Sequence, residues 1–350
     1  MNGVFIAGLA LVSGMALAWG FRNLPGERWQ MIASAPARKI GEGQWEGVNF
    51  TWYGFLTATA YASAVALFII LYGSLGASFT GAVVFIILTL LVCAPASKIV
   101  ARIVEGKLHT FTVGGAVFTG IIVCPWLAVG VDRLFSETPA GGLPVLPAIS
   151  AAAVAYSFGE GIGRLACLSF GCCYGVSLSS LSPWSQKTLK GLGMIFHGKT
   201  KKIAYEGGLE GVPVAPVQAM TSVIYMTQAV LSSWLFLNAY FMEAFIVSIT
   251  VTQFWRVFSE TLRADYRGGG KISAYQIMGI VAPFYAALVM WLIGQPPDVG
   301  NIDAARGLLT LWDPWVILFL QSIWLAAFFY TGKSRVTASR LSFYVRMDCV

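Results

Sequence analysis

The chain has 350 residues, of which 57% are hydrophobic and only 11% are charged, and its mean hydropathy is +0.71. In soluble domains roughly a quarter of all residues are charged, so this composition excludes an ordinary soluble protein. The formal net charge of +7 indicates basic loops beside anionic lipid headgroups, and we expect no nucleic-acid partner.

Nine apolar segments predict an all-α polytopic membrane protein. A helix needs about 20 apolar residues to cross the hydrocarbon core of a bilayer, and each segment is close to that length. In chain order the segments are 2–21, 52–72, 79–97, 111–131, 146–170, 215–237, 241–262, 272–293 and 311–330.

The first segment has two interpretations. Residues 16–18 read Ala-Leu-Ala and resemble the cleavage site of a signal peptide. The segment lacks a basic region at its start, however, and Arg22 and Arg28 follow it, which favours a retained helix with its N-terminus outside. We expect the polar stretch 24–50 to be an interfacial loop.

The prediction divides the chain into three parts. Residues 1–51 form an N-terminal membrane helix and its polar loop, and residues 52–294 form a seven-helix membrane core. Residues 295–350 form an extra C-terminal membrane helix and a basic tail. Within the core, 174–213 is the long polar insertion and should form a small cap outside the membrane.

Loop charges predict the orientation of the chain. The loops after the first, third, fifth and seventh helices and the C-terminal tail share one side, here called side A. Of the 23 basic residues, Arg133 and Arg306 fall on the opposite side, Arg164 and Arg256 fall within helices, and the others lie on side A. The positive-inside rule makes side A cytoplasmic, so we expect a multi-pass protein of the cell membrane with a cytoplasmic C-terminus.

The segment 159–175, GEGIGRLACLSFGCCYG, places charges inside a membrane helix. Glu160 and Arg164 are four residues apart and lie on one helix face. A charge at bilayer depth costs at least ~2.5–3.5 kcal/mol, so it is rarely kept without a partner or a function. The glycines of this segment let another backbone or a ligand come close.

A second charged segment, 254–267, lies in a later helix. Arg256, Glu260 and Arg263 are spaced i, i+4 and i+7 and form one helical stripe, so Glu260 can pair with either arginine. Arg164 and Arg256 both lie in the side-A half of their helices. We therefore expect one cavity near side A that contains both guanidiniums and both carboxylates.

Two arginines in a membrane cavity suit an anionic headgroup. A guanidinium offers phosphate a planar, bidentate fork and keeps its charge, and it can stabilise charge on a leaving phosphate oxygen. We predict Arg164, Arg256 and Glu260 as catalytic residues, and Glu160 and Arg263 as binding residues. The alternative is that these groups form neutral ion pairs that only hold helices together.

Weaker candidates for substrate binding are Tyr53, Gly114, Gly115, Gln218 and Cys172. Each also has a structural interpretation: an aromatic belt for Tyr53, close helix packing for the glycines, a helix cap for Gln218 and inert packing for the thiol. The six cysteines show no CxxC spacing and the two histidines lie far apart, which argues against a zinc site. We predict no metal and no cofactor.

The order of these motifs resembles the prolipoprotein diacylglyceryl transferase family, in particular divergent relatives with a GCCYG ending. The similar segments are WYG at 52–54; AR at 101–102 for the family's GAR; FTVGGAVFTG at 111–120 for GG(M/L)SFHGG; GRLACLSFGCCYG at 163–175 for the signature GRIGNFxNGExxG; PVQ at 216–218 for HPxQLYE; FWRVFSETLRAD at 254–265 for FRFxxEFFRxPD; and SAYQ at 273–276 for LSxGQ.

The resemblance implies an activity and assigns roles to residues. The family moves a diacylglyceryl group from phosphatidylglycerol to the thiol of a preprolipoprotein cysteine, with no metal or cofactor. Its two essential arginines correspond to Arg164 and Arg256, and the partners of the second correspond to Glu260 and Arg263. The partners implied are an anionic membrane phospholipid and a preprolipoprotein.

The chain departs from the family at the acceptor side of the site. Cys167 and Phe170 stand where the signature has asparagines, and Cys172 stands where it has glutamate. Val113 replaces a histidine, and Met220-Thr221 replace Tyr-Glu. The family works on the exterior face, whereas the loop charges place Arg164 toward the cytoplasm. A different acceptor, or a lipid-binding or transport protein without enzymatic activity, therefore remain alternative predictions.

Overall fold

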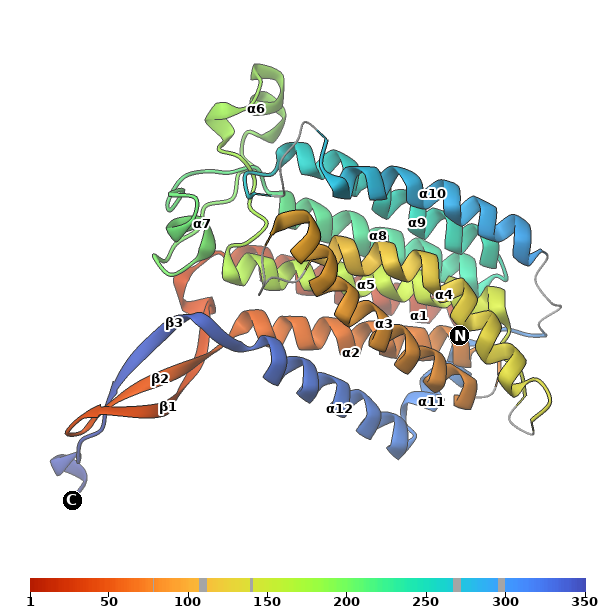
Figure 1. The fold of residues 1–350 in the computed structure, drawn as a ribbon, viewed down its shortest axis with the longest axis horizontal. Helices are drawn as coiled ribbons and strands as arrows, with labels where there is room; N and C mark the ends of the chain where they lie inside the picture. Colours follow the sequence, from red (N-terminus) through yellow and green to blue (C-terminus); the bar gives the residue numbers. More distant parts are fainter. Residues whose placement is uncertain (78, 107–111, 139–140, 267–271, 295–299) are drawn as a thin grey trace.

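The computed structural model describes residues 1–77, 79–106, 112–138, 141–266, 272–294 and 300–350 (Figure 1). Within these ranges, nine helices are long and apolar enough to cross a membrane, which confirms the predicted all-α polytopic class. They are α1 (Asn2–Asn23), α2 (Trp52–Gly73), α3 (Phe79–Glu105), α4 (Val113–Phe135), α5 (Val145–Phe170), α8 (Val217–Leu237), α9 (Phe241–Ser259), α10 (Ala274–Ile293) and α12 (Pro314–Thr331).

Helix α5 is the centre of the bundle. It has the largest buried share of the nine helices, and it packs against α2, α8 and α9, whereas α12 has the smallest buried share. Its glycines allow this packing: a Cβ at Gly159 would lie 2.7 Å from Ala64 Cβ of α2, and one at Gly161 would lie 2.5 Å from Met226 Cγ of α8. Small residues at helix contacts let backbones approach closely in membranes.

The polar segments contain short elements. These are η1 (Glu27–Trp29), η2 (Leu178–Ser180), α6 (Pro183–Leu189), α7 (Lys202–Tyr205), η3 (Glu260–Leu262), α11 (Ala304–Leu311) and η4 (Met347–Cys349). The helix predicted over 311–330 corresponds to α12, Pro314–Thr331. Asp313 caps α12 by accepting from the Trp315 N–H at 2.8 Å, and Pro314 occupies the first turn, so α11 and α12 are separate helices.

A three-stranded antiparallel sheet projects from the side-A end of the bundle (Figure 1). It contains β1 (Met31–Gly41), β2 (Gln44–Thr51) and β3 (Lys333–Ser342), with Trp45 paired to Leu341 and Val48 to Ala338. The prediction of an interfacial loop over 24–50 was therefore wrong. β1 is almost entirely exposed, and β3 alternates only between exposed and half-buried residues, so neither strand shows the apolar alternation that identifies a strand in a sequence.

The polar insertion 174–213 is tied to the end of α5 by Lys201. This side chain is fully buried, and its Nζ donates to Leu24 O at 3.0 Å and to Ser169 O. Burial lowers the pKa of Lys201 to about 7. The last carbonyls of a helix have no partner within the helix, and Lys201 donates to one of them. This bond holds the insertion beside the segment 163–175.

Candidate functional site

The centre of the site is Glu160, a carboxylate that binds two arginines. Glu160 accepts from Arg164 Nη2 one turn further along α5, and from Arg256 Nη2 of α9 at 2.9 and 3.0 Å. The side chains of Glu160 and Arg256 are 4% and 6% exposed. A buried carboxylate with charge-assisted hydrogen bonds remains ionised, so Glu160 couples α5 to α9 electrostatically.

The structure changes the partner that the sequence suggested for Arg256. The helix α9 ends at Ser259, and Glu260 begins the 3-10 turn η3, so Arg256, Glu260 and Arg263 do not form one helical stripe. Arg263 lies 3.6 Å from Glu260 and donates from Nε to Asp265 Oδ1 at 2.8 Å. Arg263 therefore has two carboxylate partners.

A small cavity joins these groups. It has a volume of about 10 Å³, room for about one water molecule, and is lined by Arg164, Val217, Thr221, Tyr225, Arg256, Ser259, Glu260 and Arg263. Arg164 Nε and Arg256 Nε belong to two of the lining residues, and both are buried with no hydrogen-bond partner among the described residues. Buried N–H groups usually have partners, so these two guanidiniums have hydrogen-bonding capacity that the described residues do not use.

The glycines at the start of α4 have different surroundings. A Cβ at Gly114 would lie 2.9 Å from Arg256 Nη1 and 2.6 Å from the ring of Tyr275. A Cβ at Gly115 would instead lie 2.4 Å from Val100 Cβ of α3. Gly114 thus makes room for the Arg256 guanidinium, whereas Gly115 serves the contact between α3 and α4.

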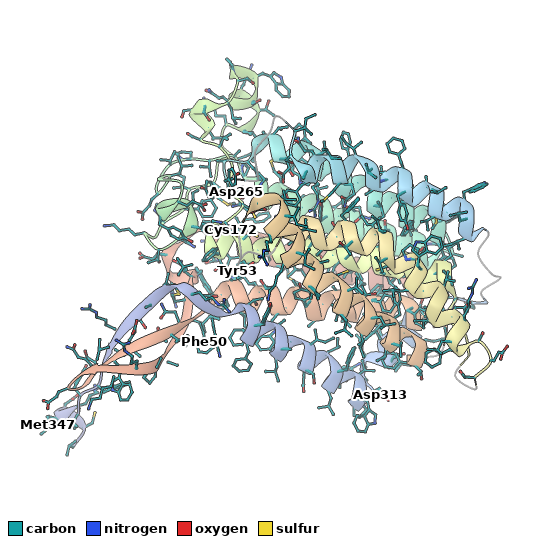
Figure 2. All side chains as sticks on the ribbon, viewed as in Figure 1. Phe50, Tyr53, Cys172, Asp265, Asp313 and Met347 are labelled. Atoms are coloured by element: carbon teal, nitrogen blue, oxygen red, sulfur yellow. The ribbon has the colours of Figure 1, made fainter. Side chains whose placement is uncertain are left out.

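Gln218 and Tyr53 lie beside the segment 163–175 rather than in the arginine cavity. Gln218 is fully buried and its Nε2 donates to Cys172 O at 2.8 Å. The ring of Tyr53 lies 5.5 Å from that of Phe170. Figure 2 shows Tyr53, Cys172 and Asp265 at the same end of the bundle. Gln218 therefore positions a backbone turn of the signature.

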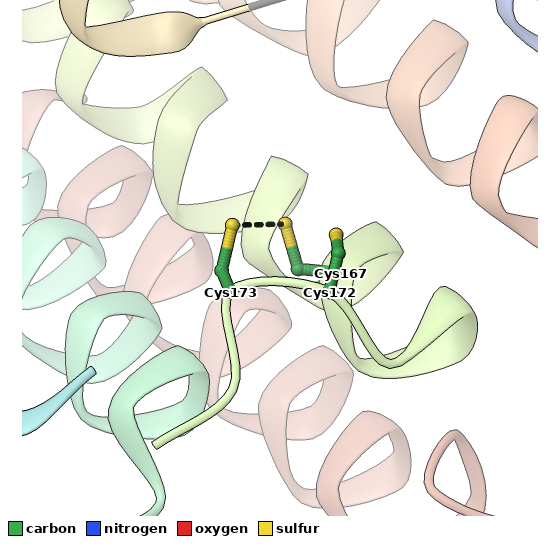
Figure 3. A group of neighbouring side chains, drawn as sticks. All are labelled: Cys167, Cys172 and Cys173. Carbon is green, nitrogen blue, oxygen red and sulfur yellow. Dashed lines mark hydrogen bonds between the residues drawn. The ribbon is translucent and has the colours of Figure 1, made fainter. Parts of the chain in front are cut away.

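Three thiols gather at this turn. The Sγ atoms of Cys167, Cys172 and Cys173 all lie within 4.8 Å of one another, and Cys167 Sγ lies 4.0 Å from Cys173 Sγ (Figure 3). The turn follows Gly171, which ends α5 in the left-handed conformation with φ 72°. Cys173 also has a positive φ of 55°, which costs roughly 1–2 kcal/mol for a residue with a side chain.

The thiols do not titrate alike. Hydrogen bonds with Cys167 and Cys172 lower the pKa of the Cys173 thiol well below its ordinary value, and the charges of Arg263 and Arg164 act in the same direction. Hydrogen bonds with Cys167 and Cys173, and burial, raise the pKa of Cys172. Cys167 and Cys173 were absent from the predicted site because their convergence depends on the turn at Gly171.

The structure brings most predicted site residues together. Arg164, Arg256, Glu260 and Arg263 line one cavity, and Glu160 and Gly114 contact its arginines. Gly115 lies apart. The sequence reasoning missed Tyr156, whose hydroxyl lies 3.4 Å from Arg256 Nη2, and Tyr225 and Thr221 of the cavity wall. A signal for Tyr156 existed, since it precedes Glu160 by one helical turn.

These observations define a multi-pass membrane protein with an arginine-lined cavity near one end of the bundle. Residues 44–293 match the family model of prolipoprotein diacylglyceryl transferase. This match covers more than half of the chain, so the chain belongs to that family and is a transferase. No curated protein and no solved structure matches the chain.

Replacing Glu160 tests the central carboxylate. Glu160→Gln leaves two buried guanidiniums without their anion, and breaking a buried ion pair costs about 3–5 kcal/mol, so we expect a large loss of stability. The matched control is Glu260→Gln, because Arg263 keeps its bond to Asp265. Thermal unfolding of the purified proteins in detergent compares the two. A smaller loss for Glu160→Gln than for Glu260→Gln would contradict the arrangement.

Gly114 tests the space around Arg256. Gly114→Ala places a methyl group against the guanidinium, and a displacement of about 1 Å can cost a hundredfold in rate, so transfer activity should fall on the order of 100-fold. The control is Gly130→Ala in the same helix, where a Cβ would meet no atom within 4 Å. Initial rates in lipid nanodiscs measure both. Equal rates for the two variants would show that Arg256 does not need this position.

Proposed function

We propose that the cavity binds the phosphate of phosphatidylglycerol and that the chain transfers the diacylglyceryl group of this lipid to the cysteine thiol of a prolipoprotein. The observation that carries the proposal is that Arg164 and Arg256 line one cavity and that the Nε of each is buried without a hydrogen-bond partner among the described residues. A phosphodiester oxygen satisfies such donors with charge-assisted hydrogen bonds.

The charges of the site fall into two groups. Glu160 divides one negative charge between Arg164 and Arg256, which leaves one positive charge that a phosphodiester would neutralise. Arg263 has two carboxylate partners, Glu260 and Asp265, which leaves one negative charge, so the two groups together are neutral. The cavity holds about one water molecule, so phosphate binding requires side chains to move apart. Arg164 is the most exposed of the three arginines, at 13% against 6% for Arg256 and Arg263, and is best placed to move.

The chemistry is a substitution at carbon. The acceptor thiolate attacks the terminal glycerol carbon of the lipid, a C–S bond forms, and the C–O bond to phosphate breaks. The electron pair leaves on the phosphate oxygen, so glycerol phosphate departs with an additional negative charge. Arg164 and Arg256 stabilise that charge, and in a buried, low-dielectric site such stabilisation lowers the barrier more than it would in water.

Arginine substitutions test this role. Removing one preorganised donor from the leaving oxygen costs about 100- to 1000-fold in rate, so Arg164→Ala and Arg256→Ala should each lose at least that much. Lysine keeps the charge but lacks the bidentate fork, so Arg256→Lys should recover little activity. The control is Arg133→Ala, an exposed arginine on the opposite side. Transfer to a lipobox peptide from phosphatidylglycerol vesicles measures all four, and wild-type rates for Arg164→Ala would reject the proposal.

A second function is favoured by one observation. Cys167, Phe170 and Cys172 stand at the positions of the signature amides and carboxylate, so the same phosphate site can serve a different acceptor. Analysis of lipids after overexpression separates the two functions. A new lipid product without lipoprotein modification supports the different acceptor, and modified lipoprotein without a new lipid supports the first.

We also propose that the chain lies in the plasma membrane and that side A, where the cavity lies, faces the cytoplasm. The distribution of loop arginines and lysines supports this orientation. Two kinds of reporter can be fused after Val350. One that is active only in the cytoplasm should be active, and one that is active only outside the cell should be inactive. A reporter fused before Met1 should give the opposite result. Exterior activity of the C-terminal fusion would overturn the orientation and place the cavity on the exterior face.

A further inference from the structure

The thiol group at the end of α5 is the one group of three or more cysteine, histidine or acidic side chains spaced as metal ligands in the described part of the chain. In the tetrahedral sites of zinc, Zn–S bonds of about 2.3 Å place sulfur atoms about 3.8 Å apart. The sulfur atoms of Cys167, Cys172 and Cys173 lie within 4.8 Å of one another, with one separation of 4.0 Å. Closing around an ion therefore requires movements of about 1 Å or less.

The backbone is shaped to bring the thiols together. Cys167 lies in the last turn of α5, Gly171 reverses the chain, and the Cys172 N–H donates to Cys167 O at 3.2 Å. Cys173 adopts a positive φ of 55°, a conformation that residues with side chains avoid. Strained conformations persist where the surrounding structure enforces them, and they cluster at functional sites. The strain at Cys173 brings its sulfur atom next to Cys167 (Figure 3).

Neighbouring segments hold this turn on both sides. Gln218 binds Cys172 O, and the Ala264 N–H donates to Tyr174 O at 3.1 Å. A Cβ at Gly175 would lie 2.3 Å from Ala215 O, so the chain after the turn packs directly against another backbone. A ligand set built on a rigid turn needs little reorganisation when it binds an ion.

The charge around the thiols suits thiolates. The positive charges of Arg164 and Arg263 act on the Cys173 sulfur. Three thiolates around a divalent ion leave one net negative charge, which a guanidinium can balance. Cysteine thiolates are soft ligands and select ions such as Zn²⁺.

We propose that Cys167, Cys172 and Cys173 bind one Zn²⁺ ion as three thiolates and leave its fourth position for the acceptor thiol. The assignment of the fourth position rests on the proposed transfer to cysteine; the ion site itself does not. Catalytic zinc sites combine three protein ligands with one open position, whereas structural sites are closed. On binding, the acceptor thiol loses its proton to solvent, and its sulfur keeps the electron pair that attacks the lipid carbon.

The metal content of the purified full chain tests the ion site. Protein extracted in detergent without chelators should contain one zinc per chain, and the variant Cys167→Ser/Cys172→Ser/Cys173→Ser should contain none. The matched control is Cys93→Ser/Cys124→Ser. Cys93 and Cys124 interact through their side chains, and within the described ranges no third cysteine, histidine or acidic side chain joins them as a possible metal ligand. The control should retain zinc.

A measurement on the wild-type chain covers the case in which the triple variant does not fold. Alkylation followed by mass spectrometry should find Cys167, Cys172 and Cys173 protected in the loaded protein and reactive after chelation, with the exposed Cys349 reactive in both. Absence of zinc both after purification and after titration of the reduced protein with Zn²⁺ would overturn the site. Zinc retained by a folded triple variant, or a disulfide within the group in native membranes, would do the same.

Cobalt substitution tests the fourth position. Co²⁺ in place of Zn²⁺ gives a thiolate-to-metal charge-transfer band whose intensity rises with each added thiolate. A lipobox peptide with cysteine should raise this band, and the same peptide with serine should not. A bound ion with no response to the cysteine peptide would reject the acceptor role and keep the ion site. Because these readouts need no lipid donor, they are independent of the arginine experiments.

Discussion

The site depends on one buried carboxylate that two helices share. Glu160 lies in the most buried helix of the bundle and binds Arg256 of α9 as well as Arg164 of its own helix. Without it, two guanidiniums would face each other in a medium of low dielectric constant, where like charges repel strongly. The carboxylate therefore permits two arginines to be buried together. One carboxylate cannot satisfy two guanidiniums, and the Nε groups of Arg164 and Arg256 have no hydrogen-bond partner among the described residues.

The end of α5 connects this charge cluster to the polar insertion. Lys201 donates to the carbonyl of Ser169 in the last turn of α5. Gln218 donates to the carbonyl of Cys172 in the turn that follows. The Gly171 N–H continues the helical pattern by donating to Cys167 O at 2.8 Å, after which the chain reverses. The arginine cavity and the thiol group are thus carried by adjacent turns of one segment. A movement of the insertion would be transmitted to both.

The sequence predicted the parts of this arrangement that follow from local patterns. The nine membrane helices were predicted because apolar runs of membrane length are a strong signal, and Arg164 and Arg256 were selected because charges in such runs are costly. The sheet was missed because β3 comes almost at the other end of the chain from β1 and β2, and its half-buried positions are mostly polar, at Ser334, Thr337 and Ser339. The pairing of Arg256 with Glu160 was missed because it joins two helices, whereas sequence spacing shows only pairs within one.

The thiol group was missed for a different reason, and the reason explains its chemistry. Zinc motifs are recognised by the spacing of cysteines on standard turns, but Cys167 and Cys173 converge only because Gly171 and Cys173 both adopt positive φ. One of these thiols, Cys172, stands where the family signature has its glutamate. A transferase that alkylates a thiol needs a thiolate at neutral pH, and a free cysteine with a pKa of about 8.5 supplies only a small fraction of it. A thiophilic ion deprotonates a bound thiol without a base. The two proposed sites are therefore chemically complementary: three thiols holding an ion would generate the nucleophile, and the guanidiniums would stabilise the leaving group.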